Sequence, residues 1–323
     1  MLLDGARATV RNAGMTPPTI AVTGATGFIG NRLVEMLGEE GFSVLALTRS
    51  ASRAKPVFPK RRFPSVEVVQ YDPNALGAWV ERLEGCAGVV HLAGAPIAGR
   101  WTPSFKQAIR DSREYGTRTL IEALASLKSR PPVLISSSAC RYYGISERGS
   151  FDETSQPIDT EDFLSGTCII WEGEAAAAEA LGIRTVIIRH GFALAMTPRF
   201  RRTLMTFRRF TGGRVGSGRQ WISWIHRDDT CHVIIKALRD ETMSGAYNAT
   251  APSPVRMADF SRELGSLVGG RLRLPVPSMI IEQVFGDGAT VILDGQRVTS
   301  ARLQEAGFRF RHPDLREALA SIL

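Results

Sequence analysis

The sequence has no apolar run long enough to cross a membrane, and it is sparing in residues that bind metals or form disulfides. No stretch approaches the roughly 18 apolar residues of a membrane-spanning helix, so we expect no membrane partner. The four cysteines are scattered and form no Cys-x-x-Cys pair, which favours a reducing, cytoplasmic compartment. The five histidines lack both His-x-x-x-His and His-Glu-x-x-His spacing, so we predict no metal site.

The composition is otherwise that of an ordinary globular protein with an excess of positive charge. Of 323 residues, 44% are hydrophobic and 22% are charged, which is enough apolar content to bury a full core. The length predicts one large domain and a smaller lobe. The net charge of +8 favours an anionic ligand.

Seven arginines crowd together between residues 199 and 219. They form either a rim that attracts phosphate groups or the solvated face of a basic helix over 198–210. No nucleic-acid-binding motif accompanies them, so we expect no nucleic-acid partner. The seven are Arg199, Arg201, Arg202, Arg208, Arg209, Arg214 and Arg219.

Short apolar runs alternate with amphipathic stretches over the first 190 residues. Helical patterns cover 28–40, 104–127 and 162–181. Apolar strands that alternate with helices indicate a parallel sheet covered on both faces. We therefore predict an α/β fold: a doubly wound parallel-sheet Rossmann fold with a smaller C-terminal lobe. The predicted strands are 19–24, 42–48, 66–71, 88–94, 132–138 and 184–190.

The most specific motif, TIAVTGATGFIG, covers the first predicted strand and the start of the first helix. Gly24 permits a tight turn, Gly27 lets backbone amides approach a pyrophosphate, and Gly30 lets helix and strand pack closely. The unpaired N–H groups and positive dipole end of the helix would bind the phosphates. A plain glycine-rich turn is the alternative, but the strand-loop-helix context favours a dinucleotide site. The predicted contacts come from Gly24, Thr26, Gly27, Phe28, Ile29 and Gly30.

The second predicted strand indicates which dinucleotide binds. Enzymes that use NAD usually place an acid at the end of this strand to bind the ribose 2′-hydroxyl. This chain has Arg49 there instead, and a guanidinium can grip a 2′-phosphate. We therefore predict NADP(H) as the cofactor, although an ordinary surface role for Arg49 stays open.

Two further strand ends fit a dinucleotide cleft. Asp72 closes the third strand and either accepts a hydrogen bond from adenine or forms a turn before Pro73. Leu92, Ala93 and Gly94 end the fourth strand with small residues, which let the ribose and nicotinamide side of the cofactor pass closely. A plain strand-end turn is the alternative for these three residues.

The pattern changes after residue 190, and this change sets the predicted domain limits. Residues 1–18 form an N-terminal extension whose early acid and lack of an apolar segment argue against a signal peptide. Residues 19–190 form the NADP-binding Rossmann domain, to which 226–250 return. Residues 191–225 and 251–323 form a smaller substrate lobe over the carboxyl edge of the sheet, where such folds bind ligands.

From about residue 19 to 323 the chain resembles an atypical branch of the extended short-chain dehydrogenase/reductases. This branch is the epimerase-like family often labelled nucleoside-diphosphate sugar epimerase, with a C-terminal domain of unknown function. The resemblance implies an NADP-binding Rossmann domain, a C-terminal lobe and oxidoreductase or epimerase chemistry, without a defined substrate. It is carried by VTGATGFIG, HLAGAPIAGRWTPSFKQAIRDSREYGTRTLIEAL, SSSACRYYG, GSGRQWISWIHRDD and DGQRVTSARLQEAGFRFRHPDLREAL.

The resemblance also implies a catalytic serine followed by Tyr-x-x-x-Lys on the next helix. Ser138 falls at the serine; the alternative is that the three serines here only hydrogen-bond a strand end. The Tyr-x-x-x-Lys pair is missing, because alignment on Glu172 puts Leu164 at the tyrosine and Cys168 at the lysine. The standard mechanism, in which the lysine lowers the tyrosine pKa, therefore cannot operate.

Three explanations of this gap stay open. Tyr142 or Tyr143 acts as a substitute acid, supported by Arg141 or Arg113, or both tyrosines merely pack. Cys168 is a reactive thiol, or, as is more usual for a cysteine on an apolar helix face, buried and inert. Alternatively, the protein binds NADP(H) without turnover.

Ligand contacts are also expected beyond the phosphate loop. Arg113 lies where related enzymes carry a helix asparagine, and His190 follows the sixth strand, so both are predicted to approach the cofactor. Arg219, Gln220 and Trp221 resemble a substrate-side segment, in which Arg219 would grip a phosphate or carboxylate.

We therefore predict an NADP(H)-dependent oxidoreductase or epimerase-like enzyme that acts on a small polar substrate. The candidate substrates are anionic compounds and nucleotide sugars. The alternative is a non-catalytic NADP(H)-binding sensor or scaffold. By analogy with extended relatives, the chain is predicted to form a homodimer through the helices around 104–127 and 162–181.

Overall fold

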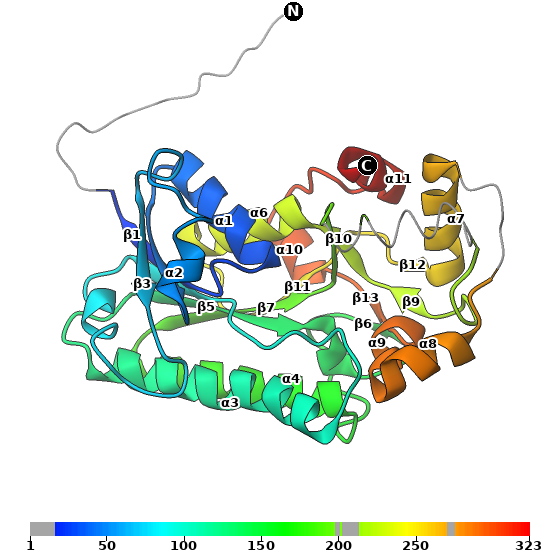
Figure 1. Cartoon of the computed structure of the whole chain (residues 1–323), viewed down its shortest axis with the longest axis horizontal. Helices are drawn as coiled ribbons and strands as arrows, with labels where there is room; N and C mark the ends of the chain where they lie inside the picture. The colour runs from blue at the N-terminus through cyan, green and yellow to red at the C-terminus, as the bar shows by residue number, and fades with distance from the viewer. Residues whose placement is uncertain (1–16, 198–200, 202–212, 270–274) are drawn as a thin grey trace, which may run out of the picture.

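A parallel sheet of seven strands forms the centre of the molecule (Figure 1). This computed structural model describes residues 17–197, 201, 213–269 and 275–323. The sheet consists of β1 (Thr19–Thr23), β2 (Ser43–Thr48), β3 (Val66–Gln70), β4 (Gly88–His91), β5 (Val133–Ala139), β7 (Arg184–His190) and β11 (Gly245–Ala249). Its order is β11-β7-β5-β4-β1-β2-β3, and each pairing is parallel. The predicted parallel α/β sheet is confirmed.

Helices cover both faces of the sheet, because its strands are apolar on both sides. The main ones are α1 (Phe28–Glu39), α3 (Pro103–Ser126), α4 (Phe163–Ala176) and α6 (Arg227–Arg239). Figure 1 shows α1 and α6 above the sheet and α3 and α4 below it. Leu33 of α1 and Ile234 of α6 share one core with Ile135 of β5, whereas Leu124 of α3 packs with Leu134 of the same strand. Successive side chains of β5 point to opposite faces of the sheet and thus belong to two separate cores.

The strand order reverses beside β1, which has β2 on one side and β4 on the other. In doubly wound sheets a crevice opens at such a switch point, outside the carboxyl ends of the strands. A ligand is therefore expected at the loops that follow β1 and β4.

A smaller set of elements packs beyond the carboxyl edge of the sheet, at the right of Figure 1. Trp224, Phe260 and Leu319 belong to its separate apolar core. Three two-stranded sheets join it, pairing β10 with β8, β12 with β9, and β13 with β6. Its elements are β6 (Ser150–Phe151), β8 (Phe192–Leu194), β9 (Trp221–Ile222), β10 (Trp224–His226), β12 (Val255–Arg256), α7 (Met257–Val268), α8 (Ser278–Phe285), α9 (Thr290–Leu293), β13 (Arg297–Val298) and α11 (Leu315–Ile322). The short helix α10 (Ala301–Glu305) instead packs against β11, and its Leu303 belongs to the core that covers the central sheet.

Short elements complete the connections. They are α2 (Ala51–Ala54) and the 3₁₀ turns η1 (Glu81–Leu83), η2 (Cys140–Tyr143), η3 (Ala177–Leu181) and η5 (Gly286–Ala289). The predicted helix over 162–181 is therefore α4 followed by the 3₁₀ turn η3.

Parts of two sequence predictions lie outside the described residues. These are most of the N-terminal extension 1–18, of which only 17 and 18 are described, and the basic helix over 198–210, of which only Arg201 is described. Arg199, Arg202, Arg208 and Arg209 fall in the latter segment. Among the helices that the structure does describe, none combines the length and apolarity needed to span a bilayer.

Candidate functional site

The loops that follow six strands of the central sheet meet at its carboxyl edge, because these strands are parallel. β1 and β2 are followed by the phosphate loop and Arg49, and β3 and β4 by Asp72 and the segment 92–94. Ser138 lies near the end of β5, and His190 ends β7. The structure thus brings the residues predicted from separate motifs to one edge.

The phosphate loop needs its glycines for close packing. Gly24 has a φ of +66°, and a Cβ there would lie 2.8 Å from the Leu92 carbonyl. A Cβ on Gly30 would lie 2.3 Å from the Gly24 carbonyl oxygen, and one on Gly27 would lie 3.0 Å from the same atom. Any larger side chain at Gly24 or Gly30 would push the loop away from the end of β4.

The N-terminus of α1 has its backbone N–H groups open. Gly27 is the N-cap and provides no side-chain acceptor, and the first turn contains no acid. The first N–H groups of a helix have no partner within it, and they carry the positive end of the helix dipole. Phe28 and Ile29, which belong to this turn, are therefore placed to bind an anion through their backbone.

A buried hydrogen-bond cluster holds the end of β4 against the phosphate loop. The Thr23 hydroxyl accepts hydrogen bonds from the N–H groups of Leu92 and Ala93, at 3.2 and 3.3 Å. Thr23 Oγ1 also lies 2.8 Å from Nδ1 of His91, and Nε2 of that ring lies 3.1 Å from Thr117 Oγ1. Burial, with the nearby charge of Arg113, lowers the pKa of His91 to about 4. His91 is therefore a neutral anchor of the crevice floor.

Arg49 and Asp72 line the same cavity, of about 430 Å³, at the ends of β2 and β3. Arg49 is exposed and has no acidic partner among the described residues. Asp72 accepts a hydrogen bond from the N–H of Asn74 at 2.9 Å, so it forms the predicted turn. Its carboxylate also lines the cavity, so the turn does not exclude a ligand contact.

Arg113 projects from α3 to the end of β4. Its guanidinium would lie 3.3 Å from a Cβ on Gly94, and its Nη1 donates to the carbonyls of Ala95 and Ile109. It also lies over the ring of Trp171, 4.9 Å from the centroid. Burial lowers its pKa. Arg113 therefore places a cation beside the segment predicted to contact ribose.

Ser138 belongs to a buried ionic network. Its hydroxyl donates to Oε1 of Glu172 at 2.6 Å. Arg189 donates to both oxygens of that carboxylate, at 2.9 and 2.8 Å. Burial alone would lower the pKa of Arg189, but the hydrogen bonds and charge of Glu172 raise it above its ordinary value. The Ser138 hydroxyl thus donates its hydrogen bond to the Glu172 carboxylate, which also pairs with Arg189.

The two adjacent tyrosines lie in different environments. Tyr143 is fully buried; its hydroxyl donates to Oδ1 of Asn248 and accepts from Nη1 of Arg189, both at 2.8 Å. Burial raises its pKa, which argues against proton transfer near neutral pH. Tyr142 is half-buried, and its ring lies 3.5 Å beneath the Arg189 guanidinium. Its hydroxyl has no hydrogen-bond partner among the described residues.

Cys168 occupies the position expected for the catalytic lysine. It is 5% exposed, and burial, reinforced by the charge of Glu172, raises its pKa to about 12. The thiolate is the nucleophilic form of cysteine, so this thiol is inert near neutral pH. The inert interpretation of Cys168 is the one that the environment favours.

His190 presents a free nitrogen at the end of β7. Its Nε2 lies 3.0 Å from the Ser137 hydroxyl. Its Nδ1 is buried and has no hydrogen-bond partner among the described residues. Burial lowers the pKa of the ring to about 4. An unpaired buried polar atom is costly, so a polar partner for His190 Nδ1 would be stabilising.

The three residues predicted to contact substrate differ in exposure: Gln220 is buried, Trp221 is half-buried and Arg219 is exposed. Gln220 is buried, and its side-chain amide donates to the carbonyls of Val215 and Ile292. Trp221 donates to the Glu147 carbonyl and stacks under Arg256 at 3.8 Å. Arg219 is exposed and lies 3.5 Å from the Glu147 carboxylate. These contacts show Gln220 and Trp221 holding the lobe together.

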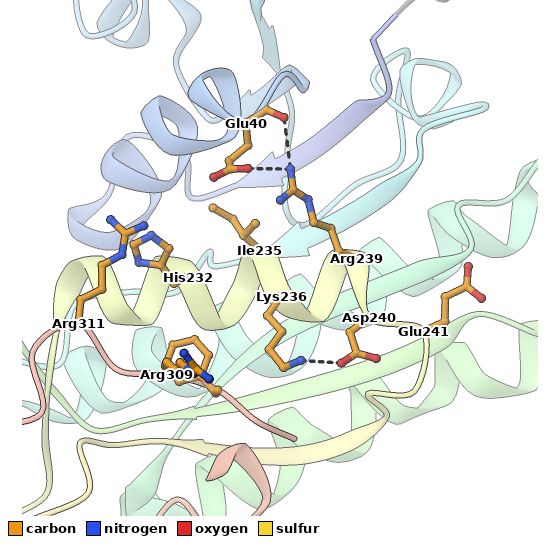
Figure 2. A pocket seen from close by; sticks show the side chains of 10 residues that line it. Glu40, His232, Ile235, Lys236, Arg239, Asp240, Glu241, Arg309 and Arg311 are labelled. Carbon is orange, nitrogen blue, oxygen red and sulfur yellow. Dashed lines mark hydrogen bonds and ion pairs between the residues drawn. The ribbon is translucent and has the colours of Figure 1, made fainter. Parts of the chain in front are cut away.

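A second cavity, of about 810 Å³, lies along α6 and is lined at one end by Glu40 and Arg239 (Figure 2). Glu40, which lines it, follows the last residue of the 12-residue helix α1, and such a helix is about 18 Å long. Arg239 pairs with Glu40 at 2.7 Å, and Lys236 pairs with Asp240 at 2.6 Å. Four of the charged side chains that line this cavity are therefore paired with one another.

Sequence reasoning missed the roles of Arg189 and Asn248 and the position of Arg227. Arg189 and Asn248 lie side by side on the paired strands β7 and β11. The signal was available, since charged and amide residues near the ends of buried strands need partners. Arg227 lies over Phe28 of the phosphate loop helix, 5.5 Å from its ring centroid. This contact joins segments too distant in the chain to be foreseen.

In the described part of the chain, no three His, Cys, Asp or Glu side chains gather as a metal site.

The sheet order, the glycine loop and the open N-terminus of α1 together define a dinucleotide-binding Rossmann protein. Residues 20–249 match the NAD dependent epimerase/dehydratase family, and residues 276–322 match a domain of unknown function, DUF1731. The chain belongs to the NAD dependent epimerase/dehydratase family, and the predicted resemblance to epimerase-like extended short-chain dehydrogenases is confirmed.

Individual relatives cover nearly the whole chain. It is 39% identical to the chloroplastic epimerase family protein SDR39U1 homolog of Arabidopsis thaliana, over 94% of this chain and 86% of the relative. It is 34% identical to the epimerase family protein YfhF of Bacillus subtilis, over 94% and 97%. The crystal structure of human epimerase family protein SDR39U1 with NADPH superposes with a TM-score of 0.79, at 28% identity over 94% of this chain and 98% of that one.

Proposed function

We propose that this protein is an NADP(H)-dependent oxidoreductase or epimerase-like enzyme that acts on a small polar substrate of the nucleotide-sugar type. The observation that carries the proposal is the cavity shared by Arg49 and Asp72, at the ends of β2 and β3, where β2 is the neighbour of β1. A guanidinium at this place favours a 2′-phosphate over a free 2′-hydroxyl. The NADPH in the human relative's structure supports the same choice of cofactor.

The residues present fit such a cofactor. The closely packed Gly24 and Gly30 leave the N-terminus of α1 bare for a pyrophosphate. His190 ends β7, which lies two strands from β4 in the sheet. Its unpartnered Nδ1 would receive a polar group at the nicotinamide end. Arg113 supplies a cation beside Gly94 where ribose hydroxyls would pass. Each part of the dinucleotide thus has a matching group along the edge.

A bound NADP(H) supplies or accepts a hydride at its nicotinamide ring. The protein must then exchange a proton with the substrate, and Tyr-x-x-x-Lys is absent. We assign that role to Tyr142, because its hydroxyl is unpaired among the described residues, whereas the Tyr143 hydroxyl is held at both sides. Arg189 orients the Tyr142 ring by stacking 3.5 Å above it. Ser138 and Glu172 act indirectly by holding Arg189.

The test is turnover of NADPH or NADP⁺ with a panel of sugar nucleotides and carbonyl compounds. We expect hydride transfer with at least one substrate class, followed by absorbance of NADPH, and its loss in Tyr142→Phe. Tight NADPH binding with no turnover across the panel would argue against an oxidoreductase. Epimerisation, which regenerates the cofactor, is followed separately by NMR of the sugar products.

The second candidate is an NADP(H)-binding sensor or scaffold without catalysis. It is favoured by the burial of Leu164 and Cys168, the two residues at the Tyr-x-x-x-Lys positions. A robust hydride transfer that disappears in Tyr142→Phe would eliminate this candidate. The proposed dimer through α3 and α4 is tested independently by sedimentation velocity of the full chain.

A further inference from the structure

Arg227 lies where helix α6 meets the opening turn of α1. Phe28 and Arg32 are one helical turn apart and therefore share a face of α1. The first two residues of α6 contact this row in order: Asp228 pairs with Arg32, and Arg227 lies over the ring of Phe28 at 5.5 Å. Arg227 is thus the member of the pair that lies at the mouth of the phosphate loop.

The charge of Arg227 is only weakly paired within the described structure. Its side chain is 26% exposed, and its Nε is buried without a hydrogen-bond partner in that part of the chain. The nearest carboxylate oxygen, Oδ1 of Asp228, lies 3.8 Å away. That carboxylate already accepts hydrogen bonds of 3.2 and 3.0 Å from Arg32. Arg227 therefore has an N–H donor without a hydrogen-bond partner in the described part of the chain.

Two positive features lie near each other at this point, because Phe28 is the first residue of α1 and Arg227 lies over its ring. The first turn of α1 has open N–H groups, no acid and no side-chain cap, and it carries the positive end of the helix dipole. A half-buried guanidinium beside it is unfavourable unless an anion lies between them. The arrangement is therefore that of a phosphate site with a cationic side wall.

We propose that Arg227 donates to the pyrophosphate of the bound dinucleotide and contributes affinity shared by NADPH and NADH. This inference rests on the proposed function and adds that two arginines bind different phosphate groups of the cofactor. Arg49 binds the 2′-phosphate at the ends of β2 and β3, and Arg227 binds the pyrophosphate from the first turn of α6. The packing of α6 against α1 thereby positions a cofactor-binding side chain.

The experiment is isothermal titration calorimetry of the full chain with four ligands that dissect the cofactor. NADPH, NADH and ADP-ribose contain the pyrophosphate, whereas adenosine 2′-monophosphate lacks it. Arg227→Met retains the stem that covers Phe28 and removes the charge. We expect it to weaken the first three ligands about ten- to hundredfold and to change adenosine 2′-monophosphate by less than about twofold. Arg239→Met, on the same helix but paired with Glu40, is the control and is expected to leave all four affinities unchanged.

The outcomes separate the inference from the function beneath it. If the wild-type chain binds NADPH and Arg227→Met binds all ligands equally well, the role of Arg227 is overturned and the proposed function stands. An equal loss for adenosine 2′-monophosphate also overturns it. Absence of dinucleotide binding by the folded wild-type chain overturns both. If Arg227→Met does not fold, Arg227→Lys is titrated instead; it is expected to weaken the three pyrophosphate ligands by less than tenfold, and unchanged affinities there count against the proposal.

Discussion

Ser138 donates a hydrogen bond of 2.6 Å to Glu172, and through that carboxylate it is joined to Arg189. The side chains of Glu172 and Arg189 are only 10% and 6% exposed. A serine at the catalytic position of the family is therefore part of the support beneath the crevice. The same guanidinium holds both tyrosines that follow β5, one through its ring and the other through its hydroxyl.

Breaking this ion pair should destabilise the fold. Glu172→Gln leaves the Arg189 charge buried without its counter-charge, which costs about 3–5 kcal/mol of unfolding free energy. Urea denaturation followed by circular dichroism measures the loss. The double variant Glu172→Gln with Arg189→Met should be less destabilised than the sum of the single variants. Additive losses would show that the two residues are not coupled.

Tyr142 and Tyr143 should separate activity from stability. Tyr143→Phe removes the hydroxyl between Arg189 and Asn248 and leaves buried polar groups unpaired, which costs about 1–3 kcal/mol of stability. Tyr142→Phe removes a hydroxyl with no partner among the described residues, so we expect stability within about 0.5 kcal/mol of wild type and loss of turnover. Urea midpoints and initial rates, measured on both variants, check the split. The reverse pattern would contradict the assignment.

The general position of the site was predictable because parallel strands deliver their carboxyl ends to one edge. Arg49 and Asp72 were predicted from different motifs, and the structure places them in one cavity. The choice between Tyr142 and Tyr143 was not predictable, because a 3₁₀ turn points adjacent side chains in different directions. The stacking of Arg227 on Phe28 depends on how α6 packs against α1, which no local pattern reports.

Arg49 should control cofactor preference. Arg49→Ala removes a charge-assisted pair with the 2′-phosphate, so we expect NADPH binding to weaken by about 1–3 kcal/mol and NADH binding to stay nearly unchanged. Calorimetric titrations with both cofactors provide the measurement. Arg53, on the adjacent short helix α2, offers a matched control as Arg53→Ala. Equal losses for NADPH and NADH would remove Arg49 from the 2′-phosphate.

Gly30 should tolerate no side chain. Gly30→Ala would place its Cβ 2.3 Å from the Gly24 carbonyl oxygen, which forces α1 away from the loop. We expect a loss of about 1–3 kcal/mol in stability and at least tenfold weaker cofactor binding. Gly173→Ala is the matched control, because a Cβ there meets nothing within 4 Å in α4 and alanine favours a helix by about 0.5–1 kcal/mol. Equal effects of the two substitutions would show that close packing at Gly30 is unimportant.

The protein should lose stability as the pH falls, through its buried histidines. Burial lowers the pKa of His91 and of His190 to about 4, from 6.5. Between these values the unfolded chain binds protons that the native protein excludes, so stability is fully present above about pH 6.5 and declines toward pH 4, by roughly 3 kcal/mol per histidine. Urea unfolding of the ligand-free protein from pH 7.5 to pH 4 measures the slope.

The variant His190→Gln isolates one of these contributions, because it keeps a polar group beside Ser137 and cannot titrate. Acidic side chains also titrate in the lower part of this range, so the informative quantity is the difference between variant and wild type. We expect the variant curve to fall less steeply between pH 6.5 and pH 4. Parallel curves would mean that His190 takes up a proton as readily in the native protein as in the unfolded chain, and its ring would then be solvated at the crevice rather than held neutral for a ligand.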